Sequence, residues 1–424
     1  MAAYKFQDSV DAMNERLKTP AMVIKKVIVS PLQNFFNTEA SGGILLLIVT
    51  LITLGIVNSP LAELYKHFLH IPILFSVGNF VVDKDLHHVV NDGLMVLFFY
   101  TVGLEIKREM MIGELSKPKD AALPLFAALG GMVFPALFYI AFNANPETHH
   151  GWGIPMATDI AFAVGVLTLL GKRVPVAMKA FLLAFAIIDD LGAILVIALF
   201  YSTDLVMPYL GGAAAILFVL YLLQKTGLRN LFFGILCGVL VWLAFLKSGV
   251  HATIAGVILA FITPMDRQEN GDNRLDHWIH ALHPWVAFGI MPIFAFFNAG
   301  VSLGDLDLGT FFQSTVSQGI ILGLVAGKPI GILLFCFLAV KLGLSNLPKG
   351  VRWVHLLGAG FLGGIGFTMS LFIGNLAFKN PDYETYSKGA ILLASLLSGL
   401  IGFVLLKAVI EKDSKNDLSA DSSC

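Results

Sequence analysis

Charged residues are scarce in this chain of 424 residues, because Asp, Glu, Lys and Arg together make up only 13% of it. A soluble domain carries about 25% charged residues. Hydrophobic residues reach 57%, so the composition excludes an ordinary soluble protein and indicates a membrane chain. The net charge of −1 offers no basic surface of the kind that binds nucleic acid, and we expect no nucleic-acid partner.

Cysteine is also rare. Cys237, Cys336 and Cys424 are too few and too scattered for a disulfide framework or a thiolate metal site. The N-terminus lacks a short apolar stretch followed by a small-residue cleavage site, so we expect no removed signal peptide. The first spanning helix would then direct insertion into the membrane.

Apolar windows of about 20 residues, long enough to cross roughly 30 Å of hydrocarbon, recur along nearly the whole chain. They predict an all-α integral membrane protein with about twelve transmembrane helices. The expected spans lie near residues 41–58, 89–112, 122–143, 150–170, 177–201, 205–224, 231–246, 249–263, 284–299, 317–341, 354–378 and 387–410. Two of them, 231–246 and 249–263, are short, which leaves eleven or thirteen spans open.

Lys and Arg predict the orientation, because cytoplasmic loops retain these residues. With twelve spans and both termini in the cytoplasm, 22 of the 28 Lys and Arg residues are cytoplasmic and five are external. The remaining cation, Lys328, lies within a span. The asymmetry favours an even number of helices and a cytoplasmic N-terminus.

We place a single membrane domain at residues 41–410, with a cytoplasmic tail at 411–424. Residues 1–40 precede it on the cytoplasmic side and fit either an interfacial segment or a tethered tail. In the first external loop, Gly78-Asn79 separates two β-prone runs and predicts a hairpin over 72–85. Because an isolated hairpin is only marginally stable in water, we expect it to pair with a second copy of the chain.

Two adjacent acids interrupt the fifth expected span. Asp189 and Asp190 lie near the middle of AFLLAFAIIDDLGAILVIALF, where each carboxylate costs about 2.5–3.5 kcal/mol on insertion scales. Intramembrane acids usually mark ion or proton pathways. The alternative, that neighbouring side chains pair with both acids merely to hold the bundle, is the less favoured interpretation.

Two further spans carry ionisable residues at a similar depth. The fourth has Thr158 and Asp159 after a proline, and the tenth has Lys328 beside a proline. One cation therefore accompanies three anions. Lys328 fits a purely structural counter-ion to an aspartate as well as a direct functional role.

Glycine is concentrated in the middle of the eleventh expected span, LLGAGFLGGIGFTMSLF. Broken backbone at membrane depth is tolerated where it is buried in protein or lines a cavity, and we favour an unwound centre over close packing by small residues. The fourth and eleventh spans would be the middle members of triplets 3–5 and 10–12. Interruptions in corresponding positions are typical of inverted-repeat transporters.

The chain resembles the NhaA sodium/proton antiporters from about residue 35 to 405. The resemblance rests on ATDIAFAVGVL, LAFAIIDDLGAI, KSGVHATIAGV, GKPIGI and LGGIGFTMSLFI, in the family's order and spacing. It implies two crossed, broken helices and a dimer joined partly by an external hairpin. It also implies a multi-pass protein of the bacterial inner membrane, surrounded by lipid, that is a transporter and not an enzyme and needs no cofactor.

The resemblance also implies roles for individual residues. Asp189 and Asp190 would bind Na⁺ or protons, with Thr158 as a nearby oxygen ligand. Asp159 and Lys328 would balance the helix dipoles, and Lys328 would pair with Asp189 in the empty site. The unwound part of the eleventh helix would include Gly363, Gly364 and Gly366.

A pH-sensing region of the family corresponds here to five residues: Glu105, Arg108, Glu109, His280 and His283. The spacing places the first three on one helix face, and the residues alone indicate an ordinary solvated ion-pair cluster. The family commonly has an acid directly before the first histidine, whereas this chain has Ile279. His251 matches a family histidine, but we interpret it as a hydrogen-bonded packing residue.

We therefore expect electrogenic, pH-regulated exchange of cytoplasmic Na⁺ or Li⁺ for external H⁺ by alternating access, since two acids in one low-dielectric site resist joint ionisation. The second proton would come from Asp189 or Lys328. The alternatives are a sodium-coupled solute symporter, for which no aromatic or Arg cluster supplies a substrate pocket, a passive channel, and an intramembrane aspartyl protease. No GxGD sequence surrounds these aspartates.

Overall fold

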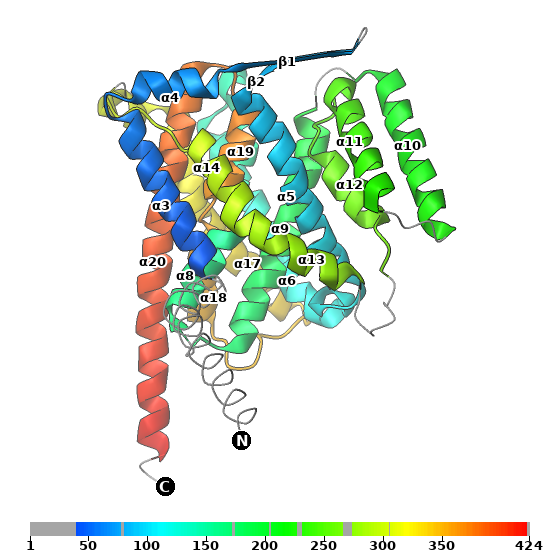
Figure 1. Ribbon diagram of the computed structural model, residues 1–424. Helices are drawn as coiled ribbons and strands as arrows, with labels where there is room; N and C mark the ends of the chain where they lie inside the picture. Colours follow the sequence, from blue (N-terminus) through cyan, green and yellow to red (C-terminus); the bar gives the residue numbers. More distant parts are fainter. Residues whose placement is uncertain are drawn as a thin grey trace, which may run out of the picture.

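A computed structural model describes residues 40–77, 80–171, 174–202, 205–226, 231–265, 274–304 and 306–421. The protein is a bundle of helices with a two-stranded hairpin at one end (Figure 1). The expected segment at 1–40 lies almost entirely outside the described residues, as do Gly78-Asn79 and the last three residues of the expected tail.

Seven helical segments within the described residues are long and apolar enough to cross a membrane. Two of them are continuous across a local change of helix type. They are α5 (Leu86–Met111), α6 (Pro118–Phe142), α9 (Val176–Phe200), α10 (Met207–Lys225), α13 with η5 and α14 (Arg274–Trp285, Val286–Ile290, Met291–Asn298), α16 with η6 and α17 (Thr315–Leu322, Gly323–Gly327, Lys328–Lys341), and α20 (Pro381–Asp421).

Three further apolar segments are bent helix pairs. α3 (Ala40–Val57) turns by 113° into α4 (Ala62–Leu69). The segment α7 (Pro146–His149) and η3 (His150–Met156) bends by 42° into α8 (Ile160–Leu169), and α18 (Trp353–Gly363) bends by 46° into α19 (Phe367–Ala377).

Two shorter apolar helices, α11 (Leu231–Ser248) and α12 (Ile254–Ile262), complete the set. Every one of the twelve expected spans thus has a helical counterpart, and the prediction of an all-α membrane protein with interrupted fourth and eleventh helices is confirmed. Gly249, whose φ is +83°, ends α11 in the left-handed conformation that favours glycine.

The boundaries depart from expectation in two places. The first loop contains the short helix α4, which the buried Tyr65 fixes by donating a hydrogen bond to the Phe296 carbonyl at 2.6 Å. α20 does not end near residue 410 but continues to Asp421. Two small elements, η2 (Glu114–Ser116) and α15 (Leu308–Gln313), lie in the connections.

The hairpin pairs β1 (Pro72–Val77) with β2 (Phe80–Asp85) in antiparallel register. Pro72 lies opposite Asp85 and Val77 opposite Phe80, which confirms the expected hairpin over 72–85. In Figure 1 it extends sideways from one end of the bundle, while the beginning of α3 and the end of α20 lie at the opposite end.

Glycine lets the central helices approach closely. A Cβ atom on Gly130 of α6 would lie 2.1 Å from the carbonyl oxygen of Gly331 of α17, and a Cβ on Gly331 would lie 2.1 Å from the Gly130 carbonyl. Only a residue without a side chain fits on either helix, as in other membrane interfaces built from small residues. A separate hydrophobic cluster, which includes Ala213 and Phe245, joins α10 to α11 and α12 beside this core (Figure 1).

Candidate ion-binding site

The two interrupted helices meet at their breaks. Residues 157–159 connect η3 to α8, and residues 364–366 connect α18 to α19. The Thr158 hydroxyl donates to the carbonyl of Gly363 at 2.8 Å, and the backbone N–H of Asp159 donates to the carbonyl of Ile365 at 2.7 Å. Each break therefore supplies partners for backbone groups that the other leaves unpaired, which makes non-helical backbone tolerable at membrane depth.

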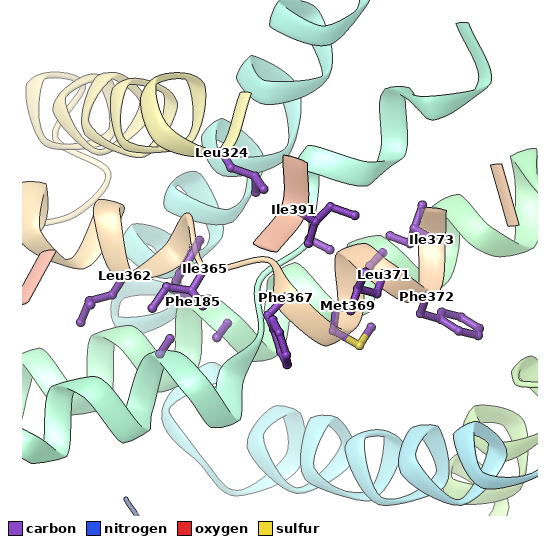
Figure 2. Packing of buried hydrophobic residues seen from close by; sticks show 14 of the residues in the cluster. Phe185, Leu324, Leu362, Ile365, Phe367, Met369, Leu371, Phe372, Ile373 and Ile391 are labelled. Atoms are coloured by element: carbon purple, nitrogen blue, oxygen red, sulfur yellow. The ribbon is translucent and has the colours of Figure 1, made fainter. Parts of the chain in front are cut away.

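Apolar side chains enclose the second break. Figure 2 shows Leu362 and Ile365 on one side of the extended connection and Phe367 on the other, with Phe185 of α9 close by. All four side chains are at most 4% exposed. The polar groups at the crossing are therefore surrounded by a low-dielectric environment, in which unpaired charges are expensive.

Asp159 caps two helix N-termini at once. Its Oδ1 accepts from the N–H of Phe162 at 3.0 Å, in the first turn of α8. Its Oδ2 accepts from the N–H of Thr368 at 3.1 Å and from the Thr368 hydroxyl, in the first turn of α19. A carboxylate in this place satisfies orphan donors and opposes the positive ends of both helix dipoles.

Lys328 supplies a positive charge at the crossing, where Asp159 supplies a negative one. Its Nζ donates to Oδ2 of Asp189 at 2.9 Å and to the carbonyl oxygen of Met156, at the C-terminal end of η3. The lysine side chain is completely buried. It follows the π-helical turn η6, a local distortion that is frequent at functional sites.

Asp189 and Asp190 project from the middle of α9, and each residue is 1% exposed. Among the described residues, Oδ1 of each aspartate has no hydrogen-bond partner. A buried oxygen without a partner is costly, unless a proton or a cation occupies it. The arrangement can bind either species, with the Thr158 oxygen beside it.

The structure thus brings together the expected residues Thr158, Asp159, Asp189 and Lys328, with Asp190 adjacent along α9. Of the three glycines expected in the unwound segment, Gly363 is the last residue of α18, whereas Gly364 and Gly366 lie in the break. The roles in ion binding proposed for all of these residues stay predictions.

The expected pH-sensing residues divide into two groups. Arg108 contacts Glu109 at 2.9 Å and Asp276 of α13 at 3.9 Å, and Glu105 lies one turn away on α5. His280 and His283 lie on α13 with exposed side chains. At position 279, where the family commonly has an acid, Ile279 packs against Leu104 and Leu275. Asp276 supplies an acid one helical turn earlier and contacts Arg108.

Sequence reasoning also missed Thr368 and the Met156 carbonyl. Thr368 lies two residues after Gly366, and a hydroxyl directly after a break is the signal that could have identified it. His251 accords with a packing role, because its Nδ1 contacts the Thr253 hydroxyl at 2.8 Å and its ring lies edge-on to Phe372. Its Nε2 lies 3.8 Å from Asp92.

A buried carboxylate pair and a buried lysine at the crossing of two broken helices, within a helical membrane protein, define a secondary ion transporter. Comparison with known proteins agrees with this class. Residues 33–406 match the model of the family described as Na⁺/H⁺ antiporter 1, and the chain belongs to that family.

Three curated relatives carry the name Na⁺/H⁺ antiporter NhaA. The chain is 52% identical to the protein of Shewanella frigidimarina over 382 residues, which cover 89% of this chain and 96% of that protein. It is 51% identical to the protein of Shewanella loihica, with 91% and 99% covered, and 46% identical to the protein of Vibrio campbellii, with 92% and 99% covered. The chain is thus a multi-pass bacterial membrane protein of a family that exchanges sodium for protons.

Proposed function

We propose that this protein is an electrogenic antiporter that expels cytoplasmic Na⁺ or Li⁺ in exchange for external protons at Asp189 and Asp190. One observation carries the proposal. Two adjacent carboxylates are buried beside a lysine and a threonine hydroxyl, and each has an oxygen without a hydrogen-bond partner among the described residues.

The ligand chemistry favours a hard alkali cation. Carboxylate, hydroxyl and backbone carbonyl oxygens suit Na⁺ and Li⁺, and no soft ligand belongs to the group formed by Asp189, Asp190 and Thr158. The larger and more weakly hydrated K⁺ is a poorer substrate for the same oxygens.

Competition between the ion and protons couples the two fluxes. Two carboxylates in one low-dielectric site resist ionising together, so a cation that binds both must replace protons. Lys328 pairs with Asp189 at 2.9 Å, and this ion pair would break when the cation binds. If two protonatable groups discharge for each Na⁺, one cycle moves net charge, and membrane potential drives transport. The second proton would leave Asp189 or Lys328.

Alternating access would use the two crossed helices. The hydrogen bonds from Thr158 and Asp159 to the second break join both helices into one mechanical unit. Rearrangement of such a unit against the rest of the bundle exposes a midplane site to one side at a time. Asp159 and Lys328 would balance the opposed dipoles throughout.

Orientation and regulation follow from the charge distribution. The excess of Lys and Arg in the expected cytoplasmic segments supports a topology with both termini in the cytoplasm and the hairpin outside. The cluster of Glu105, Arg108, Glu109 and Asp276, with His280 and His283 on α13, would then face the cytoplasm and adjust activity to pH. A homodimer joined through the hairpin completes the proposal.

Sodium-induced proton movement in everted membrane vesicles tests the central claim. We expect Asp190→Asn to abolish the response, because the amide cannot take up a proton or neutralise a cation. Asp382→Asn, at an exposed acid in the first turn of α20, is the matched control and retains the wild-type response. Equal responses from wild type and Asp190→Asn would remove the proposed site.

A further inference from the structure

Three histidines and one aspartate form a second polar cluster at the base of the hairpin, outside the carboxylate site. His70 follows α4, Asp85 ends β2, and His87 and His88 open α5. The backbone N–H of Leu86 donates to the carbonyl of Ile71 at 2.9 Å. This contact closes the base of the hairpin and brings residues that are distant in sequence to one place.

The side chains converge on the carboxylate of Asp85. Its Oδ2 lies 2.7 Å from Nδ1 of His70, and its Oδ1 lies 2.5 Å from Nδ1 of His88. Asp85, His87 and His88 each offer one ligand atom, and these three atoms lie within 4.8 Å of one another. The side chains of His70 and His88 are 65% and 56% exposed, so an ion can reach the cluster from solvent.

His87 is oriented for ligation by a buried amide. Its Nε2 lies 3.1 Å from Oδ1 of Asn298, which also accepts from the amides of Asn91 at 3.0 Å and Asn375 at 2.5 Å. Nε2 also lies 3.3 Å from Nδ2 of Asn91, so two amides hold the ring in place. In the tautomer whose Nε2–H donates to Asn298, the lone pair is on Nδ1, as in metal-binding histidines whose second nitrogen donates to a carbonyl group.

We propose that Asp85, His87 and His88 bind a divalent transition-metal ion of the Zn²⁺ type, with His70 as the fourth ligand. Imidazole nitrogens together with one carboxylate are the donor set that Zn²⁺ accepts in tetrahedral sites, whereas Ca²⁺ and Mg²⁺ require oxygen ligands. Binding displaces the protons that the histidine nitrogens share with Asp85, and the protons are released to solvent.

The site would connect elements that move separately in a transporter. The ion would join α4, β2 and α5 directly. Through His87 and Asn298 it would also reach α14 and α19, since Asn375 belongs to α19. The site therefore lies two hydrogen bonds, through Asn298, from α19, the second half of an interrupted helix.

Isothermal titration calorimetry with ZnCl₂ tests the proposal on the purified full-length protein, after removal of any affinity tag and treatment with chelator. We expect one Zn²⁺ per chain, with proton release that depends on the buffer. His88→Ala and Asp85→Asn should each weaken binding by about tenfold or more, since even second-shell substitutions cost about 10–100-fold. Asp85→Asn retains a side chain that can cap α5, which protects the fold.

His67→Ala is the matched control, because His67 is an exposed histidine of α4 on the same side of the molecule. It should bind Zn²⁺ like the wild type. Co²⁺ used as a surrogate should give the visible absorption of a tetrahedral site in the wild type and lose it in His88→Ala. Absence of saturable binding, or equal affinity in wild type, His88→Ala and Asp85→Asn, would overturn the assignment.

Discussion

The Nζ atom of Lys328 lies 2.9 Å from Oδ2 of Asp189, and both side chains are fully shielded from solvent. The lysine also donates to the Met156 carbonyl, so one cation contacts both a carboxylate of α9 and the last carbonyl of η3. Removing one partner of a buried ion pair leaves the other as an uncompensated charge. The stability of the protein should therefore depend on both partners of this pair.

Lys328→Met should lower the free energy of unfolding by about 3–5 kcal/mol, the range measured when one partner of a buried pair is removed. The double variant Lys328→Met with Asp189→Asn should recover part of this loss, because it leaves no buried charge of the pair. Thermal unfolding in detergent, followed by the fraction of monodisperse protein, measures both of these variants and the single variant Asp189→Asn. Strictly additive losses would contradict direct coupling between the two residues.

Thr368→Val should destabilise the protein by about 1.5–3 kcal/mol, the usual contribution of a hydrogen bond to a charged group. It should also slow sodium-induced proton movement. The substitution preserves side-chain shape but removes the hydroxyl that donates to Asp159. Thr368→Ser keeps the hydroxyl and should restore both properties. If the valine and serine variants behave alike, the hydroxyl has no role at the crossing.

Glu105→Gln should shift the pH profile of activation without abolishing exchange, because it removes one titratable group from the helix face that carries Arg108 and Glu109. Initial exchange rates in everted vesicles across a pH series measure the shift. Asp276→Asn, which removes the contact between Arg108 and α13, should shift the profile as well. Glu411→Gln, at an exposed position of α20, should not. A profile unchanged in both test variants would count against a sensing role for this cluster.

Gly331→Ala should prevent normal packing of α17 against α6, because the added Cβ would lie 2.1 Å from the Gly130 carbonyl. We expect lower expression and a lower thermal midpoint. Gly212→Ala in α10 is the control, since an added Cβ there has nothing within 4 Å and alanine favours the helix by up to about 1 kcal/mol. Comparable stability of the two variants would show that the helices separate at little cost.

If the proposed homodimer forms through the hairpin, replacing residues 74–83 with a short Gly-Ser linker should make the protein monomeric and leave sodium-induced proton movement intact. The change removes most of the paired strands while His70 and Asp85 stay in place. Light scattering coupled to size-exclusion chromatography measures the mass in detergent. A variant that stays dimeric would place the subunit interface elsewhere.

The spans were predictable because lipid imposes one simple rule, namely long apolar windows with few charges. The same rule made Asp189, Asp190 and Lys328 conspicuous. Helix α4 was not predictable in this way, since it is short and mixes Leu and Phe with charged residues. Its position depends on distant contacts, in which Tyr65 donates to the Phe296 carbonyl and Phe68 packs against the Phe296 and Phe297 rings.

The hydrogen bonds at the crossing were also beyond sequence reasoning. Threonines within apolar helices usually donate to the carbonyl four residues earlier, as Thr50, Thr53 and Thr101 do here. Only its position directly after the glycine-rich break separates Thr368 from these, and that position does not say which group it contacts. The Met156 carbonyl has no sequence signal at all, because every residue carries a carbonyl group and only the tertiary fold shows which one Lys328 reaches.

The hydrogen bonds exchanged between residues 157–159 and 363–368 have a consequence for how this sequence can evolve. Substitutions in one segment alone cannot convert it into a regular helix. If one segment became helical, donors and acceptors in the other segment would lose their hydrogen-bond partners. Viable replacements at Thr158, Asp159 and Thr368 should therefore arise as matched changes in both halves of the gene. The two breaks should therefore change together during evolution, although about 200 residues separate them along the chain.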